Sequence, residues 1–515
     1  MSSYLPASFD GFVPYFGDIH NHCGISYGHG SLRDAYSNAR LQLDFASVTG
    51  HAYWHDMPRG EDRLDSLVAY HEQGFARLAK RWDRVQEQTE EFHEDGRFIT
   101  FLSFEWHSME YGDHCVYFNG PKGEIIRANS LEELRAELRH VGANGLQAMA
   151  IPHHIGYQRG WRGINWDHFT EEFSPVVEMM SMHGCGEHDD APRPYMHTMG
   201  PRDAGSSVIT GLNRGYRFGL IGSTDHHSAH PGSHGHGRLA VWAPELSRQA
   251  VWDAIYARRT YALTGDRIVL AFDLGGVPMG GTCGPAPERC MTVSVAAGGP
   301  LDYVEIVRNG DVVHRETAGK SLTGQHGPFS GLLSLSVGWG ERGTTTLWEV
   351  DLEVVGGTLN SVEPRFRGEE VVAPSQMELG AFQFSTWERM SDRMVRFRTR
   401  TKGNPTPSTD ATQGLSIRVT GEDCTRIRAR INGKPVEYTV GELREGSRSG
   451  YLGGFLTPAY LFNRAVPDEE LVMNIEFVDR APNEATPGPM EWYYVRVRQK
   501  NDQWAWGSPV WVQRE

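Results

Sequence analysis

The sequence has no apolar run as long as the roughly 18 residues that a membrane-spanning helix needs, so it predicts no membrane span. Its first residues, MSSYLPASFDGFVPYF, lack the basic region and apolar stretch of a secretory signal, and we expect a cytoplasmic protein. Cysteine is also scarce. The six cysteines, at positions 23, 115, 185, 283, 290 and 424, form no CxxC pair, so we expect mostly reduced, buried thiols.

Positive charge is in deficit as well. Lys and Arg number 50 against 65 Asp and Glu, which gives a net charge of -15. This balance disfavours a nucleic-acid partner, because binding to a phosphate backbone needs clustered basic residues. It is compatible with a small anionic substrate, since bound divalent cations would reverse the local potential. We therefore expect a small-molecule substrate, and the sequence leaves the oligomeric state open.

Histidine, by contrast, is abundant and unevenly distributed. Of the 23 histidines, 21 lie between His20 and His236, and only His314 and His326 fall in the rest of the chain. A polar residue type that is concentrated in one half of a chain indicates that this half carries the chemistry.

The pattern of apolar residues divides the 515-residue chain into two predicted domains, residues 1–265 and 266–515. In the first, short apolar runs alternate with helical patterns, which predicts a mainly parallel sheet closed into an α/β barrel. One long helix, or two shorter ones, is predicted over residues 61–94, and further helices near Ser130 and Ser247. In the second, strands that alternate apolar and polar residues predict a mainly antiparallel, β-sandwich-like region, with a flexible surface loop over 402–414.

Ionisable residues recur where the apolar runs of the first domain end. The segments GDIHNH, VTGH, SFEWH, IPHH, VEMM and STDHH each place His, Asp or Glu at the C-terminal edge of such a run. In a closed α/β barrel these edges converge on one face, where active sites lie. Buried strands exclude ionisable groups unless the groups are paired or bind a metal. The pattern therefore predicts a metal site at the mouth of a barrel.

Several of these residues are candidate metal ligands. His20 and His22 form an HxH pair, and alternation along a strand points both side chains to the same side. Glu105 ends the run RFITFLSFE, where its carboxylate could bridge two cations. The other candidates of these types are His114, His153 and the DxH pair Asp225 and His227. Mixed imidazole and carboxylate ligands suit zinc, manganese or iron, and two such ions could share a hydroxide nucleophile.

The chain resembles the PHP (polymerase and histidinol phosphatase) superfamily, and most closely a poorly characterised branch known as a domain of unknown function. The matching motifs are GDIHNH, VTGH, SFEWH, GDHCVYF, AIPHH, VVEMMSMHG, IGSTDHH, YARRTYALTGDRI and YYVRVRQKNDQWAWGSPVWV, so the resemblance covers nearly the whole chain. It implies a distorted (β/α)7 TIM-like barrel with two or three divalent ions. It also implies hydrolysis, typically of phosphoesters.

The resemblance further implies a ligand set for each metal. The implied ligands are His20, His22, Glu105 and Asp225 for the first metal; the bridging Glu105 with His114 and His153 for the second; and His51 and His227, joined by His29, for the third. His29 follows His22 at a spacing that varies in the family. The chain departs from the family at Gly50, where the usual motif TDH reads Thr49-Gly50-His51. A two-metal enzyme is therefore an alternative to a three-metal one.

Three further residues are candidate catalytic groups. Glu178 and His183, in VEMMSMHG, fall where a barrel strand would open toward substrate. They either act on substrate as acid or base, or hold the metal ligands through hydrogen bonds. Arg162, in a loop rich in Gly and Trp beyond His153, either clamps an anionic group or is solvated. His154 points away from the site under strand alternation and is expected to be structural, as is His226.

Three alternative functions are compatible with these features of the sequence. The first is a metal-dependent phosphoesterase. The second is a metal-dependent hydrolase or lyase acting on an ester, amide, lactone or glycosidic bond, because no Gly-rich phosphate cradle is visible. The third is a non-catalytic protein whose β-rich half binds carbohydrate or a partner, as its share of the 14 Trp and 19 Tyr would allow. Those aromatic residues more typically fill cores and domain interfaces.

Overall fold

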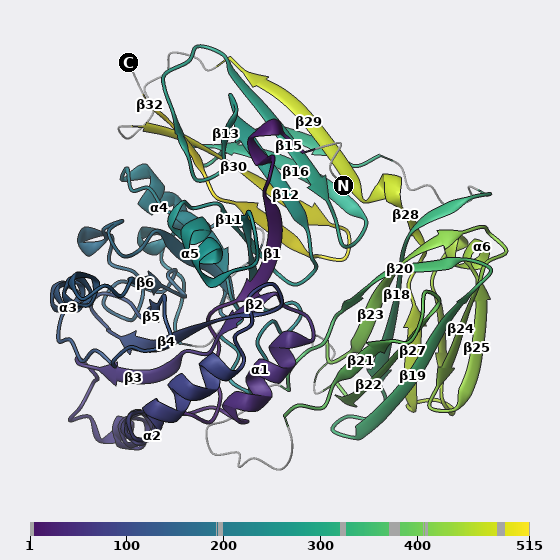
Figure 1. The fold of residues 1–515 in the computed structure, drawn as a ribbon, viewed down its shortest axis with the longest axis horizontal. Coiled ribbons are helices and arrows are strands. Elements are labelled where there is room, and N and C mark those ends of the chain that lie inside the picture. The colour runs from purple at the N-terminus through teal and green to yellow at the C-terminus, as the bar shows by residue number, and fades with distance from the viewer. Residues whose placement is uncertain are drawn as a thin grey trace.

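A computed structural model describes residues 5–191, 193, 199–319, 326–369, 382–404, 406, 410–480 and 490–513. These residues form an N-terminal α/β part and two β-rich parts that pack around it (Figure 1). None of the described helices is long and apolar enough to cross a membrane. The surface loop predicted over 402–414 lies partly outside the described residues, at 405 and 407–409.

The strands of the α/β part belong to two sheets. They are β1 (Val13–Asp18), β2 (Phe45–Ser47), β3 (Gly50–Trp54), β4 (Ile99–His107), β5 (His114–Phe118), β6 (Ala148–Pro152), β7 (Val176–Ser181), β8 (Gly184–Cys185), β9 (Gly219–Gly222), β10 (Arg238–Ala243) and β11 (Thr260–Leu263). In the larger sheet β11, β10, β1, β2, β4, β5 and β6 are neighbours in this order, and β3 also pairs with β4. The smaller sheet has the order β8-β7-β9.

The larger sheet is mixed, whereas the sequence predicts a mainly parallel one. β2 is parallel to both β1 and β4, and β3 is parallel to β4, but β5 and β10 run antiparallel to their neighbours. Residues 108–113 alone connect β4 to β5, and so short a connection cannot return the chain for a parallel pairing. Closure of these strands into a (β/α)7 barrel stays a prediction.

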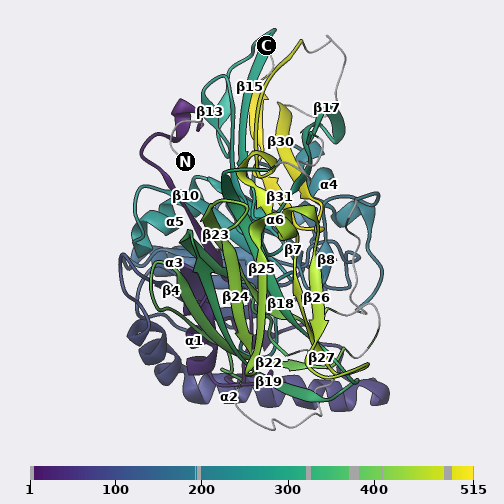
Figure 2. The same ribbon diagram turned by 90° about the vertical axis from the view of Figure 1, so that its right-hand side faces the viewer.

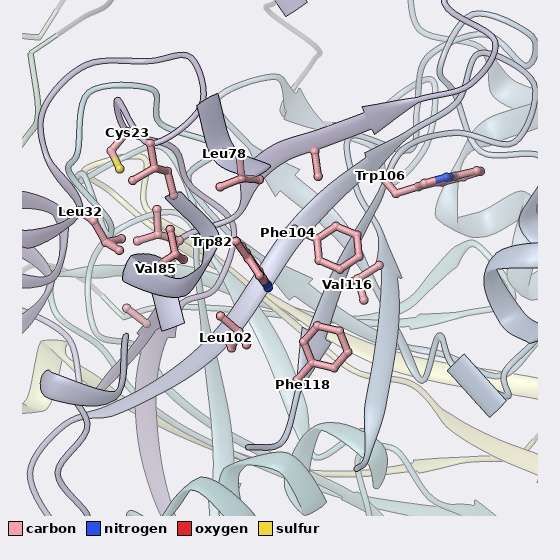
Figure 3. Packing of buried hydrophobic residues seen from close by; sticks show 14 of the residues in the cluster. Cys23, Leu32, Leu78, Trp82, Val85, Leu102, Phe104, Trp106, Val116 and Phe118 are labelled. Carbon is pink, nitrogen blue, oxygen red and sulfur yellow. The ribbon is translucent and has the colours of Figure 1, made fainter. Parts of the chain in front are cut away.

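The predicted helices are present. The helices of the α/β part are α1 (Leu32–Arg40), α2 (Asp65–Glu91), α3 (Leu131–Ala143), α4 (Val208–Asn213) and α5 (Arg248–Tyr256), with short 3-10 turns at Ala7–Phe9, Asp62–Leu64, Trp166–His168 and Ala204–Ser206. Ser130 and Ser247 cap α3 and α5 as expected. In α2, Leu78, Trp82 and Val85 recur at helical spacing and enter the core over β4 and β5 (Figure 3).

The first β-rich part consists of two packed sheets. Its strands are β12 (Val269–Leu274), β13 (Val277–Pro278), β14 (Thr282–Cys283), β15 (Arg289–Ala296), β16 (Leu301–Arg308), β17 (Asp311–Thr317), β29 (Val472–Asp479), β30 (Met490–Gln499), β31 (Trp504–Gly507) and β32 (Val510–Gln513). The sheet β13-β12-β15-β29 shares one apolar core with β16 and β30. β31 pairs with β11, so the last strands of the chain extend the sheet of the α/β part.

The second β-rich part is an antiparallel sandwich. It contains β18 (Phe329–Trp339), β19 (Thr345–Val355), β20 (Thr358–Pro364), β21 (Thr386–Arg389), β22 (Met394–Lys402), β23 (Gln413–Gly421), β24 (Arg426–Ile431), β25 (Lys434–Thr439), α6 (Val440–Glu445), β26 (Arg448–Tyr451), β27 (Pro458–Phe462), β28 (Val466–Pro467) and a 3-10 turn at Asp468–Glu470. The sheets β20-β23-β18-β27-β26 and β21-β22-β19-β24-β25 enclose a common core. The mainly antiparallel character predicted after residue 265 is confirmed, while the division into two domains stays a prediction.

Tryptophans of the C-terminal strands fill the contact with the α/β part. Trp492, Trp504, Trp506 and Trp511 are buried in one cluster with residues of β7, α4 and β9. These rings therefore serve packing and do not form an exposed platform of the kind that stacks on a sugar.

Candidate metal centre

Seven of the nine predicted metal ligands lie together in a largely buried cluster of the α/β part, namely His20, His22, His51, Glu105, His153, Asp225 and His227. Their ligand atoms form overlapping groups in which all atoms lie within 4.8 Å of one another. One group is His20, His22 and Asp225, and another is His22, His51 and His227. His22 belongs to both, so its side chain joins the two groups.

Hydrogen bonds between distant segments bring these residues together. The N–H of Asp225, after β9, donates to the carbonyl of His20, after β1, over 2.7 Å. The buried carboxylate of Asp18, at the end of β1, accepts from the backbone N–H groups of Thr224 at 3.1 Å and Gly232 at 2.7 Å. The ends of two strands that lie about 200 residues apart in the chain are thereby fixed side by side.

Glu105 lies at the centre of the cluster. Its Oε2 is 3.5 Å from Nε2 of His22 and 3.3 Å from Nε2 of His51. Its Oε1 is 3.0 Å from Nε2 of His153 and 3.3 Å from Nδ1 of His107. Burial raises the pKa of the Glu105 carboxyl well above its usual value. A carboxylate whose two oxygens face different imidazoles is suited to bridge two cations.

Three histidines of the cluster hold Nδ1 against an oxygen atom of the protein. The pairs are His20 with Glu178 Oε2 at 2.7 Å, His51 with Ser26 Oγ at 3.1 Å, and His227 with the carbonyl of Asp225 at 2.8 Å. Such a bond fixes the ring orientation and the tautomer, and leaves Nε2 as the nitrogen available to an ion.

The chemistry of the donor set fits divalent cations. Among the described residues, both ring nitrogens of His153, Nδ1 of His22, Nε2 of His107 and Oε2 of Glu105 are buried without a hydrogen bond. Burial, and then repulsion by neighbouring histidines, lowers the pKa of His22, His51 and His153 well below the usual value, which keeps these rings neutral. Neutral imidazoles and carboxylates are ligands of zinc, manganese and iron, and a buried polar atom without a partner is costly.

The predicted ligand His114 lies outside the ligand groups. β5 pairs with β4 so that Cys115 is opposite Glu105, while His114 is opposite Trp106. Successive side chains of a strand point to opposite faces, so the cysteine lies on the face of the carboxylate and the histidine on the other. Cys115 accordingly forms a ligand group with two histidines of the cluster.

The predicted ligand His29 also lies outside these groups. Its backbone N–H donates to the carbonyl of His227 over 2.8 Å, so the residue is next to the cluster. Its ring is instead stacked on that of Phe382, with centroids 5.9 Å apart.

Besides Cys115, three further residues that the sequence did not indicate as ligands join the cluster. His107 forms a group with His51 and Glu105, and Asp113 and His154 form one with Glu105 and His153. His107 follows Glu105 at the spacing of two that singled out the HxH pair, so the same signal could have found it. His154 was expected to point away, but its φ of 34° breaks the strand alternation and turns the side chain toward the site.

Glu178 and His183 both contact metal-ligand candidates. Oε2 of Glu178 binds Nδ1 of His20. This contact favours the role of holding a metal ligand over that of an acid or base acting on substrate. Nε2 of His183 lies 2.7 Å from Oδ2 of Asp225, and its Nδ1 lies 2.7 Å from the hydroxyl of Tyr157. Burial alone would raise the pKa of Asp225, but His20 and His183 hold it well below the usual value. Asp225 is therefore ionised.

Arg162 is held at the edge of the cluster. Its guanidinium donates from Nε to Oδ2 of Asp113 over 2.7 Å and lies over the ring of Trp54, 5.0 Å from the centroid. Only 17% of the side chain is exposed, which argues against the alternative that Arg162 is a solvated loop residue. Burial would raise the pKa of Asp113, but Arg162 keeps it well below the usual range.

Comparison with known proteins gives distant relatives. A family model described as a protein of unknown function, DUF3604, matches residues 233–279. An uncharacterized protein of Chlamydia pneumoniae is 27% identical over 252 residues, and one of Chlamydia trachomatis serovar D is 25% identical over 254. Each match covers 45% of this chain and 40% of the relative, so the chain spans well under half the length of these relatives.

One solved structure is similar along most of its length. It is the crystal structure of a two-domain protein from Bacteroides vulgatus that contains a predicted PHP-like metal-dependent phosphoesterase. The match covers 85% of this chain and 97% of that chain, with 13% identity and a TM-score of 0.32.

Gly50, where the sequence departs from the motif that it resembles, lies against the core. A Cβ atom at this position would come within 2.6 Å of Cδ1 of Leu78 and 3.1 Å of Cδ1 of Ile25. The space that an aspartate side chain would need is thus filled by apolar groups. His51, the next residue, still reaches the cluster, and Ser26 bonds its Nδ1.

Proposed function

We propose that this protein is a metal-dependent hydrolase of the PHP type that cleaves phosphoesters of small molecules. The observation that carries the proposal is the position of Glu105, whose two carboxylate oxygens face different sets of imidazoles within one buried cluster. The choice of phosphoesters rests on the resemblance of the sequence motifs to the PHP superfamily.

Bound divalent ions would supply the Lewis acidity that activates water and polarises the scissile bond. The chain's own residues hold the ligands for them. Glu178 orients His20 through Nδ1, and Ser26 does the same for His51. His183 fixes the carboxylate of Asp225 through Nε2.

Substrate would approach from the side of His227. This side chain is 26% exposed, whereas those of His20, His22, His51 and His153 are at most 3% exposed. Arg162 adds a positive charge whose partner Asp113 is already part of the cluster.

The proposal is tested by replacing ligands and measuring metal and turnover together. In His20→Ala and Asp225→Ala we expect the divalent metal that copurifies with the chain to be lost, together with hydrolysis of p-nitrophenyl phosphate or bis(p-nitrophenyl) phosphate. His140→Ala is the matched control, because this histidine is exposed on α3, away from the cluster. It should keep both metal and activity.

The same panel includes p-nitrophenyl acetate and p-nitrophenyl glycosides. Hydrolysis of these substrates without hydrolysis of phosphoesters would show a metal-dependent enzyme with a different scissile bond. Unchanged turnover in Asp225→Ala, or purified protein with fewer metal ions than chains and no turnover, would overturn the proposal and favour a binding protein.

A further inference from the structure

A cavity of about 860 Å³ opens beside the metal cluster, between helix α2 and the loop that joins β1 to α1. Helices α1 and α2 lie side by side in both views of the molecule (Figures 1 and 2). Four arginines line the cavity, Arg33, Arg77, Arg81 and Arg84, and none of the lining residues that the structure describes is an aspartate or glutamate. A volume of this size accommodates an organic molecule the size of a cofactor.

The arginines of α2 form a stripe along one side of the helix. Arg77, Arg81 and Arg84 recur at a spacing of four and three residues. Each comes one position before a residue of the apolar stripe that enters the core, which consists of Leu78, Trp82 and Val85. Like charges at such spacings repel one another and destabilise a helix. Within the described part of the chain none of the three forms an ion pair with a carboxylate, whereas Arg33 pairs with Glu91 at 2.6 Å. Positive charge is therefore concentrated here in a protein of net charge -15.

The wall of this cavity is also a wall of the metal cluster. Nη1 of Arg77 donates to the carbonyl of Ser26 over 2.6 Å, and the hydroxyl of Ser26 lies 3.1 Å from Nδ1 of His51. Tyr27 lines the cavity, and its ring is stacked on that of His51 with centroids 3.5 Å apart. The ring of Tyr27 also lies 6.4 Å from that of His227, the exposed histidine of the cluster.

We propose that this arginine-lined cavity binds an anionic group of the substrate that lies apart from the bond that is cleaved. The substrate class is then a small molecule with at least two phosphate groups, one at the metal cluster and one held by Arg77, Arg81 and Arg84. The guanidinium fork matches phosphate oxygens in a bidentate manner, and three neighbouring guanidinium groups favour a doubly charged phosphate over a singly charged carboxylate. That the bound molecule is a substrate rests on the proposed function, whereas the binding of an anion in the cavity does not.

The first experiment measures anion binding by itself. The probe is pyrenetetrasulfonate, a fluorescent polyanion whose sulfonates are poor metal ligands, and binding to the full metal-loaded chain is followed by fluorescence anisotropy. We expect saturable binding to one site that weakens as salt is added. In the double variant Arg81→Gln/Arg84→Gln the affinity should fall about tenfold or more, because charge-assisted hydrogen bonds are lost. Lys80→Gln, which removes one positive charge from an exposed position of α2 outside the cavity, should bind as the unaltered chain does.

The second experiment separates this site from the metal cluster. Asp225→Asn, which removes a metal-ligand candidate, should keep its affinity for the probe, since no ligand of the cluster lines the cavity. Absence of saturable binding, or equal affinity in the double arginine variant, overturns the inference. Probe binding without phosphoester hydrolysis leaves the anion site standing and refutes the proposed function. For a bisphosphate substrate that is hydrolysed, the double variant should raise KM more than it lowers kcat, and a change in kcat alone would contradict the assignment.

Discussion

The hydrogen bond between His20 and Glu178 allows a graded prediction. Nδ1 of His20 and Oε2 of Glu178 are 2.7 Å apart, and the two side chains are 1% and 2% exposed. A hydrogen bond to a charged group contributes about 1.5–3 kcal/mol, and about 1.4 kcal/mol corresponds to a tenfold change in affinity. Removing the carboxylate in Glu178→Ala should therefore weaken zinc binding by about 10- to 100-fold. In Glu178→Gln the amide oxygen still accepts from Nδ1, and losing about half of the bond's strength should weaken binding by about three- to tenfold.

Zinc affinity is measured on the metal-free chain by competition with a chelating dye. Asp266→Asn is the matched control, because Asp266 is an equally buried carboxylate whose Oδ1 lies 2.9 Å from Nε2 of His234, outside the metal cluster. This control should lower the thermal stability and leave zinc affinity unchanged. Unaltered affinity in Glu178→Ala, or weaker binding in Glu178→Gln than in Glu178→Ala, would refute the reasoning.

Two further predictions concern stability. Burial lowers the pKa of His230 to about 3, against about 6.5 in an unfolded chain, so the unfolded state binds one more proton between these values. Stability contributed by neutral His230 is thus present above about pH 6.5 and is lost as the pH falls, by up to about 1.4 kcal/mol per pH unit. His230→Leu should make the dependence of the unfolding free energy on pH shallower by one proton in urea titrations, and an identical slope would contradict this. Gly50→Asp should cost about 3 kcal/mol or more by crowding Leu78 and Ile25 with a carboxylate, and Leu78→Ala added to it should recover part of the loss.

Much of the candidate site is predictable from where ionisable residues stand relative to apolar runs. The HxH pair, His153 and the DxH pair come shortly after the end of a strand, Glu105 lies near the end of β4, and in the structure their side chains share one cluster. The sequence could not tell on which face of β5 the site lies, since that depends on the register between β4 and β5. The register opposes Cys115, not His114, to Glu105.

Other parts of the architecture depend on interactions that no local pattern reports. The alternation of apolar runs and helices predicts a parallel sheet, but the direction of β5 and β10 follows from connection lengths and long-range pairing. The return of β31 to pair with β11 joins residues about 240 positions apart. The arginine stripe of α2 is visible in the sequence as a helical repeat. The cavity that it lines is not, because the loop after β1 forms the other wall.

Backbone strain at two ligand-bearing positions bears on how the metal centre is built. His154 and Asp225 have φ values of 34° and 53°, in the left-handed region that costs a residue other than glycine about 1–3 kcal/mol. Such conformations persist only where the surroundings determine them, and at Asp225 the bond from its N–H to His20 and the bonds of Asp18 to the same loop do so. These hydrogen bonds fix the backbone from which the Asp225 side chain reaches the cluster. Because folding has already ordered these groups, an ion that binds at the cluster would meet its ligands with little further reorganisation.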